Sequence, residues 1–212
     1  MSRASKAEEI FSRLSKANPS PRGELDHVNP YTLLVAVVLS AQATDKGVNR
    51  ATEKLFRKVT TPAQMLALGE EGLIEHIKTI GLFRAKARNV MKLSHDLIEK
   101  HAGEVPQDRD ALEELAGVGR KTANVVMNIA FGVPTIAVDT HVFRVSQRLG
   151  LAKGKTPLAI EEQLLKVVPD KFLQHAHHWL ILHGRYSCVA RKPKCPDCIV
   201  RDLCPFKPKT EG

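Results

Sequence analysis

The chain has 212 residues, of which 43% are apolar and 26% charged, a composition typical of a protein with a buried core. This balance excludes wholesale disorder. The longest apolar run, Leu33 to Leu39, is far shorter than the ~20 residues of a membrane helix, and the N-terminus lacks the apolar stretch of a signal peptide. We therefore expect an unsecreted protein with no membrane partner, cytoplasmic and nucleoid-associated in a bacterium, the favoured source, or nuclear in a eukaryote.

The chain is basic. It carries 32 lysine and arginine residues against 23 aspartate and glutamate residues, a net charge of +9. Such an excess favours a polyanionic partner, most often nucleic acid. A basic surface that is simply well solvated is the alternative.

The pattern is helical almost throughout, with no convincing alternation of apolar and polar residues that would indicate a strand. Three Asn-Pro or Thr-Pro pairs, beginning at Asn29, Thr61 and Thr156, place a capping residue before a proline at a helix start. Asp45 and Asp139 are further candidate caps. The predicted helices, in chain order, are 5–17, 30–43, 46–59, 62–68, 70–79, 84–101, 109–115, 120–131, 140–149, 157–167 and 171–183.

A glycine-rich turn separates two of these helices and reads Leu-Ala-Gly-Val-Gly-Arg-Lys-Thr-Ala from residue 115. Gly117 and Gly119 precede a helix start and can expose a row of backbone N–H groups, a suitable site for phosphate. Contacts of this kind are independent of base sequence. A tight helical turn without a ligand is the alternative. A similar stretch, residues 79–87, indicates a second helical corner.

All four cysteines lie in the spacing Cys188-x6-Cys195-x2-Cys198-x5-Cys204. Four thiols within so short a segment of an unsecreted protein indicate a metal or cluster site. Zinc and a [4Fe-4S] cluster both accept four thiolates. A redox sensor or disulfide pair is the remaining alternative.

Four motifs, in their order along the chain, resemble the endonuclease III family of DNA repair glycosylases, which carry a helix–hairpin–helix. They are Leu-Ser-Ala-Gln-Ala-Thr-Asp from residue 39, the glycine turn with Lys121, Val-Asp-Thr-His from residue 138, and the cysteine spacing. The resemblance runs from about Ser5 to Phe206. It implies an all-α fold of two helical lobes, residues 22–133 with the hairpin and residues 1–21 plus 134–212 with a C-terminal iron–sulfur cluster loop, flanking a DNA cleft.

The resemblance also implies the chemistry, a bifunctional DNA glycosylase and AP lyase acting on oxidised pyrimidines or abasic sites in duplex DNA. The Lys121 amine would attack C1′ and form a Schiff base, and Asp139 would help deprotonate it across the cleft. Without this resemblance, the residues alone predict that Lys121 contacts phosphate and that Asp139 caps a helix. The four cysteines would hold the [4Fe-4S] cluster.

Further residues are expected to contact DNA. The resemblance implies that Gln42 and Leu82 fill the space that a flipped nucleotide leaves in the base stack. Without the resemblance, Gln42 would be interpreted as a helix end and Leu82 as a core residue. Asp45 is a candidate for the pocket mouth, and His141 for the pocket itself. The full set of expected DNA contacts is Gln42, Leu82, Gly117, Gly119, Arg120, Thr122, His141, Arg191, Lys192 and Lys194.

Two other functions stay open at the level of sequence. An adenine-type monofunctional glycosylase lacks the hairpin lysine and has a further C-terminal domain. A non-catalytic DNA-binding module would share the basic charge.

The nine histidines contain no His-Glu-x-x-His pattern that would indicate a hydrolytic zinc. We expect a monomer.

Overall fold

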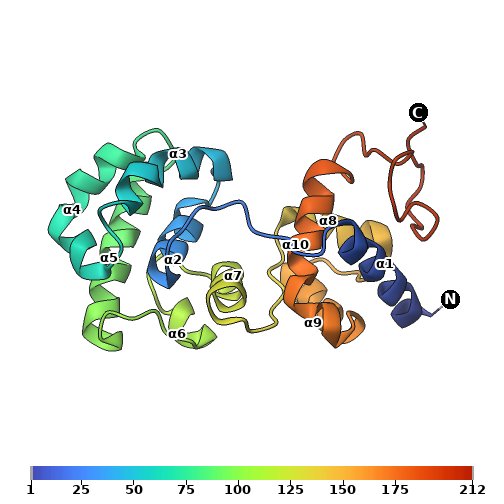
Figure 1. Ribbon diagram of the computed structural model, residues 1–212, viewed down its shortest axis with the longest axis horizontal. Helices are drawn as coiled ribbons and strands as arrows, with labels where there is room; N and C mark the ends of the chain where they lie inside the picture. The colour runs from blue at the N-terminus through green and yellow to red at the C-terminus, as the bar shows by residue number, and fades with distance from the viewer. Residues whose placement is uncertain (1, 212) are drawn as a thin grey trace. The chain divides into compact units, whose positions relative to one another are not determined.

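The computed structural model describes residues 2–211, and within that range the chain forms ten helices and no strand (Figure 1). This confirms the all-α prediction. The helices are α1 (Arg3–Ala17), α2 (Pro30–Leu39), α3 (Asp45–Phe56), α4 (Pro62–Ile77), α5 (Phe83–His101), α6 (Arg109–Glu113), α7 (Arg120–Phe131), α8 (Thr140–Leu149), α9 (Pro157–Val167) and α10 (Asp170–Tyr186). None of them is long and apolar enough to cross a bilayer.

The chain divides into two compact units. One is continuous, Glu24–Gly132, and the other combines Met1–Gly23 with Val133–Gly212. The continuous unit holds α2 to α7. Its central helix is α2, whose residues Tyr31–Leu39 are all buried, and which contacts α3, α5 and α7. Helices α4 and α5 lie side by side (Figure 1).

The second unit is built from both ends of the chain. Helix α8 lies against α10, and α1 contacts α9 and α10. Their apolar faces share one core, in which the rings of Phe11, Phe172 and Trp179 stand about 6 Å apart. The Trp179 indole N–H donates to the Asn18 carbonyl at 2.8 Å and so fixes the end of α1 against α10. The described residues after α10, 187–211, form loops and turns only.

Helix starts follow local chemistry. The side chains of Asn29, Thr61 and Thr156 each accept a hydrogen bond from the N–H three residues ahead, as the sequence predicts. Asp45 is not a cap, and that prediction is wrong. Thr44 caps α3 instead, because its hydroxyl accepts from the Gly47 N–H.

Helix ends depart further from the prediction. Helix α2 ends at Leu39 rather than at residue 43, because Gln42 has a φ of 53°, outside the helical region. The predicted helices 62–68 and 70–79 form one element, α4, with a kink at Gly69, whose φ of 75° and ψ of 165° are not helical.

Candidate functional site

The glycine turn connects α6 to α7, and its two glycines have different surroundings. Gly117 has a φ of 78°, and a Cβ there would lie 2.9 Å from the Asn89 side-chain nitrogen. Gly119 precedes α7, and a Cβ at this position would have no atom within 4 Å. No side chain caps the helix here. The first backbone N–H groups of α7 therefore lie beside an open approach, the geometry of an anion site.

Three polar residues follow this turn. Arg120, Lys121 and Thr122 occupy the first turn of α7, before the buried residues that begin at Ala123. The Lys121 side chain is exposed, whereas Arg120 and Thr122 are half-buried. The sequence prediction that Lys121 lies at the start of a helix, directly after the glycine turn, is confirmed.

Asp139 caps α8 in the other unit. Its Oδ1 accepts a 2.8 Å hydrogen bond from the Val142 N–H, so the expected capping role is confirmed. One carboxylate oxygen is thereby engaged at the N-terminal end of the helix. His141 lies half-buried on the same turn, with its Nδ1 3.4 Å from the Arg144 guanidinium.

Gln42 and Leu82 share an unusual backbone conformation. Their φ values are 53° and 59°, and only Ala102 among the other described non-glycine residues has a positive φ. Both side chains are exposed, Leu82 to 60%. Leu82 is therefore not the core residue of the alternative interpretation. Asp45 lies near Gln42 in the sequence, half-buried at the first position of α3.

The four cysteines line one cavity, together with Arg148 and His183. All four thiols are free of disulfides. In the described range, no three potential ligands are placed to hold a single metal ion. Four thiols around one cavity are a ligand set that suits a metal or cluster site.

Burial and nearby cations act on the thiols in opposite directions. Arg148 donates to the Cys188 sulfur at 3.5 Å, and His183 Nε2 lies 3.7 Å from the Cys198 sulfur. Burial raises the pKa of Cys198 and Cys204. Burial also raises the pKa of Cys195, but hydrogen bonds with Thr210 and nearby cations outweigh it, so that pKa is lowered overall. The nearby cations therefore favour the thiolate, the form that binds metal, whereas burial opposes it.

Sequence analysis missed the residues that hold the cysteine segment. Arg148 also donates to the carbonyls of Val189 and Ala190, at 2.8 and 2.7 Å. Arg144 donates to the carbonyls of Gly184 and Cys188. These arginines precede Cys188 by about forty residues and show no local motif, so only the fold reveals them. Between the first two cysteines, Arg191, Lys192 and Lys194 are all exposed.

Comparison with known proteins identifies the family. Residues 35–170 match the family described as HhH-GPD superfamily base excision DNA repair protein. Residues 188–204 match the iron-sulfur binding domain of endonuclease III. Endonuclease III of Haemophilus influenzae is 63% identical and that of Escherichia coli K12 is 59% identical, each over 96% of this chain and 96% of the relative.

Solved structures agree. A non-covalent endonuclease III–DNA complex aligns with a TM-score of 0.90 and 48% identity, covering 97% of this chain and 96% of that one. A trapped endonuclease III–DNA covalent intermediate aligns with a TM-score of 0.87 and 49% identity, covering 94% and 95%. The chain therefore belongs to the HhH-GPD superfamily of base excision DNA repair proteins and, within it, to the endonuclease III family.

Proposed function

We propose that this chain is a bifunctional DNA glycosylase and AP lyase that removes oxidised pyrimidines from duplex DNA in base excision repair. The observation that carries the proposal is an exposed lysine, Lys121, two residues after Gly119 of the glycine turn, in an endonuclease III family member. A related structure is described as a covalent intermediate with DNA. A primary amine at this position is the nucleophile that such an intermediate requires.

Lys121 carries the covalent steps. Its unprotonated Nζ attacks C1′ of the damaged nucleotide, a C–N bond forms, and the bond to the base breaks with its electron pair leaving on the base. Opening of the sugar gives a Schiff base, which acidifies the C2′ proton. Loss of that proton breaks the bond from C3′ to the 3′ phosphate oxygen and cuts the strand. A hydroxyl or carboxylate nucleophile could not supply the iminium electron sink.

Asp139 is the proposed proton acceptor for Lys121 and the counter-charge for the developing positive sugar. Its capping hydrogen bond occupies only Oδ1, which leaves Oδ2 for this role. Lys121 belongs to the unit Glu24–Gly132 and Asp139 to the unit that includes Val133–Gly212.

The remaining candidate residues are proposed to hold the DNA. The glycine turn, with Arg120 and Thr122, would bind phosphate through backbone and side-chain donors. Gln42 and Leu82 would enter the space left by the flipped nucleotide, and His141 and Asp45 would line the pocket. Arg191, Lys192 and Lys194 would contact phosphates on another stretch of duplex.

The chain carries a [4Fe-4S] cluster, as its match to the iron-sulfur binding domain of endonuclease III indicates, and we assign Cys188, Cys195, Cys198 and Cys204 as the ligands. When bound, the cluster supplies a fixed charged centre that orders the loop bearing Arg191 and Lys192. Because the relatives named above are bacterial, we place the protein, as a monomer, at the bacterial nucleoid.

Borohydride trapping on an abasic duplex tests the function. Wild-type protein should form a covalent protein–DNA adduct, and Lys121→Ala should form none. Lys92→Ala, which removes an exposed lysine on α5, is the matched control and should still form the adduct. Lys86 is unsuitable as a control because it is only 4% exposed. An adduct retained in Lys121→Ala would refute the assignment, and no adduct with wild-type protein would favour a DNA-binding module.

A damage panel separates the two glycosylase functions. Duplexes with oxidised pyrimidines should lose the base and be cut, whereas an adenine opposite a damaged guanine should stay intact. Excision of that adenine without strand cleavage would favour the adenine-type enzyme.

A further inference from the structure

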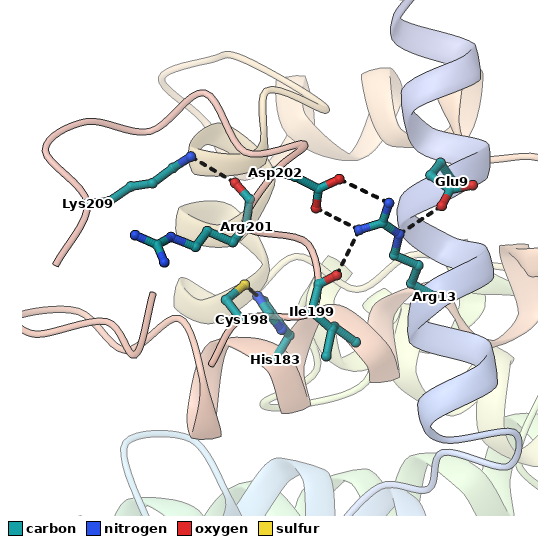
Figure 2. Close-up of polar contacts among 8 residues, drawn as sticks. All are labelled: Glu9, Arg13, His183, Cys198, Ile199, Arg201, Asp202 and Lys209. Carbon is teal, nitrogen blue, oxygen red and sulfur yellow. Dashed lines mark hydrogen bonds and ion pairs between the residues drawn. The ribbon is translucent and has the colours of Figure 1, made fainter. Parts of the chain in front are cut away.

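Arg13, near the middle of α1, reaches the segment between the last two cysteines (Figure 2). Its Nη1 donates to the Ile199 carbonyl at 3.0 Å and to Asp202 Oδ1 at 2.6 Å, and its Nη2 donates to Asp202 Oδ2 at 3.0 Å. We call these three contacts the Arg13 bridge. Arg13 precedes Ile199 by 186 positions and Asp202 by 189 positions in the chain.

The bridge acts at both ends of one short turn. Ile199 directly follows Cys198, and Asp202 lies two residues before Cys204. The turn itself has no helix or strand. Its local backbone hydrogen bonds join the N–H groups of Arg201, Leu203 and Cys204 to the carbonyls three residues before them, at 3.0, 3.2 and 3.3 Å. From outside the turn, Lys209 donates to the Arg201 carbonyl (Figure 2). The Arg13 bridge and the Lys209 contact therefore connect this locally bonded turn to the rest of the unit.

Arg13 is itself held in place. Its Nε donates to Glu9 Oε1 at 2.7 Å, so all three guanidinium nitrogens have acceptors. The turns of α1 around it bury Ile10, Phe11 and Leu14 in the core of the unit. A planar fork with two fixed donors sets both distance and angle to a carboxylate, which a single ammonium cannot do.

We propose that Arg13 is a positioning residue for the iron–sulfur cluster, which sets the spacing of Cys198 and Cys204 by bridging the turn between them to α1. Because the Asp202 side chain is 61% exposed, solvent screens the ion pair and its contribution to global stability is small. Its effect is therefore local and falls on the cysteine turn. The proposal rests on the cluster and is independent of the role of Lys121.

The test compares cluster retention in variants of the full chain purified with its cluster. These are Arg13→Gln, Arg13→Lys, Asp202→Asn, the double variant of Arg13→Gln with Asp202→Asn, and Lys171→Gln as the matched control. Lys171 forms an ion pair with Glu8, also on α1, but does not contact the cysteine turn. Visible absorbance and bound iron are followed after addition of a chelator, with helical content measured by circular dichroism.

We expect Arg13→Gln and Asp202→Asn each to lose the cluster about tenfold faster than wild type, with unchanged helical content. The double variant should be no faster than Arg13→Gln alone, because that change already removes both contacts with Asp202. Arg13→Lys should recover only part of the cluster retention, since a lysine keeps the positive charge but lacks the two fixed donors of the guanidinium group. Lys171→Gln should match wild type.

Several results would overturn the proposal. Retention equal to wild type in Arg13→Gln would do so, as would equal losses in Arg13→Gln and Lys171→Gln, which would indicate general loosening of α1. If Arg13→Gln fails to fold, Asp202→Asn decides the matter, because wild-type retention in that variant contradicts the bridge. Adduct formation by Lys121 is measured separately and does not enter this comparison.

Discussion

The backbone oxygen of Gln42 lies 3.9 Å from the point where a Cβ on Gly81 would stand. The turn after α2 and the turn before α5 are thus neighbours, although about forty residues separate them. Each turn carries one residue with a left-handed backbone, Gln42 and Leu82. Such a conformation costs of order 1 kcal/mol or more for a residue other than glycine. Two exposed side chains on strained backbone, in adjoining turns, are suited to insertion into a duplex.

Leu82→Ala separates insertion from packing. Because Leu82 is 60% exposed, the free energy of unfolding should change by no more than about 0.5 kcal/mol, against about 2–5 kcal/mol for a buried leucine such as Leu93. Base excision from a damaged duplex should nevertheless fall by about tenfold, since unstacking a base step costs a few kcal/mol that an inserted wedge offsets. Denaturant unfolding and single-turnover excision measure the two quantities. Unchanged excision would contradict insertion.

The two hairpin glycines should respond differently to alanine. Gly117→Ala places a Cβ 2.9 Å from Asn89 at a φ of 78°, and it should lower the free energy of unfolding by about 1–3 kcal/mol. Gly119→Ala meets open space and should leave stability within about 1 kcal/mol of wild type. It should instead weaken DNA binding equally for all sequences, because the methyl group obstructs backbone contact with phosphate. Equal effects of both variants on stability would argue against this division.

Asp139→Asn distinguishes the cap from the chemistry. Asparagine caps helices about as well as aspartate, so the unfolding free energy should stay close to wild type, whereas Asp139→Ala should cost about 1 kcal/mol. Both variants lack the carboxylate and should show strongly reduced base excision. Activity that survives in Asp139→Asn but is lost in Asp139→Ala would reduce Asp139 to a helix cap.

Stability should fall in mild acid because of His178. Burial, followed by the charge of His175, lowers the pKa of His178 to about 4, below the unfolded value of ~6.5. The folded state thus holds the neutral ring. The neutral His178 ring contributes fully to the free energy of unfolding above pH ~6.5. This contribution decreases as pH falls toward 4, by about 3 kcal/mol in total.

His178→Gln should therefore show a smaller loss of unfolding free energy than wild type between pH 7 and pH 4.5. His95→Gln, which removes a histidine with a 64% exposed side chain, should behave like wild type. Identical pH dependence in wild type and His178→Gln would refute the buried neutral histidine.

Much of the fold follows from local sequence. Caps such as Asn29 and Thr156 begin helices because the bonds they accept lie three residues away, and such short-range interactions are readable in one pass along the chain. The exact range 120–131 for α7 was predictable for the same reason, since glycines precede and follow it. The spacing of the cysteines likewise indicated a shared cofactor.

The sequence by itself therefore determined the helical class, most helix starts, the family and the residue types available for chemistry. Only the tertiary structure decided that Gln42 and Leu82 take left-handed conformations on adjoining turns, and that Arg13 meets Asp202. The last contact joins residues 189 positions apart. No local pattern encodes such a meeting, because it depends on how separate helices bury their apolar faces against a common core.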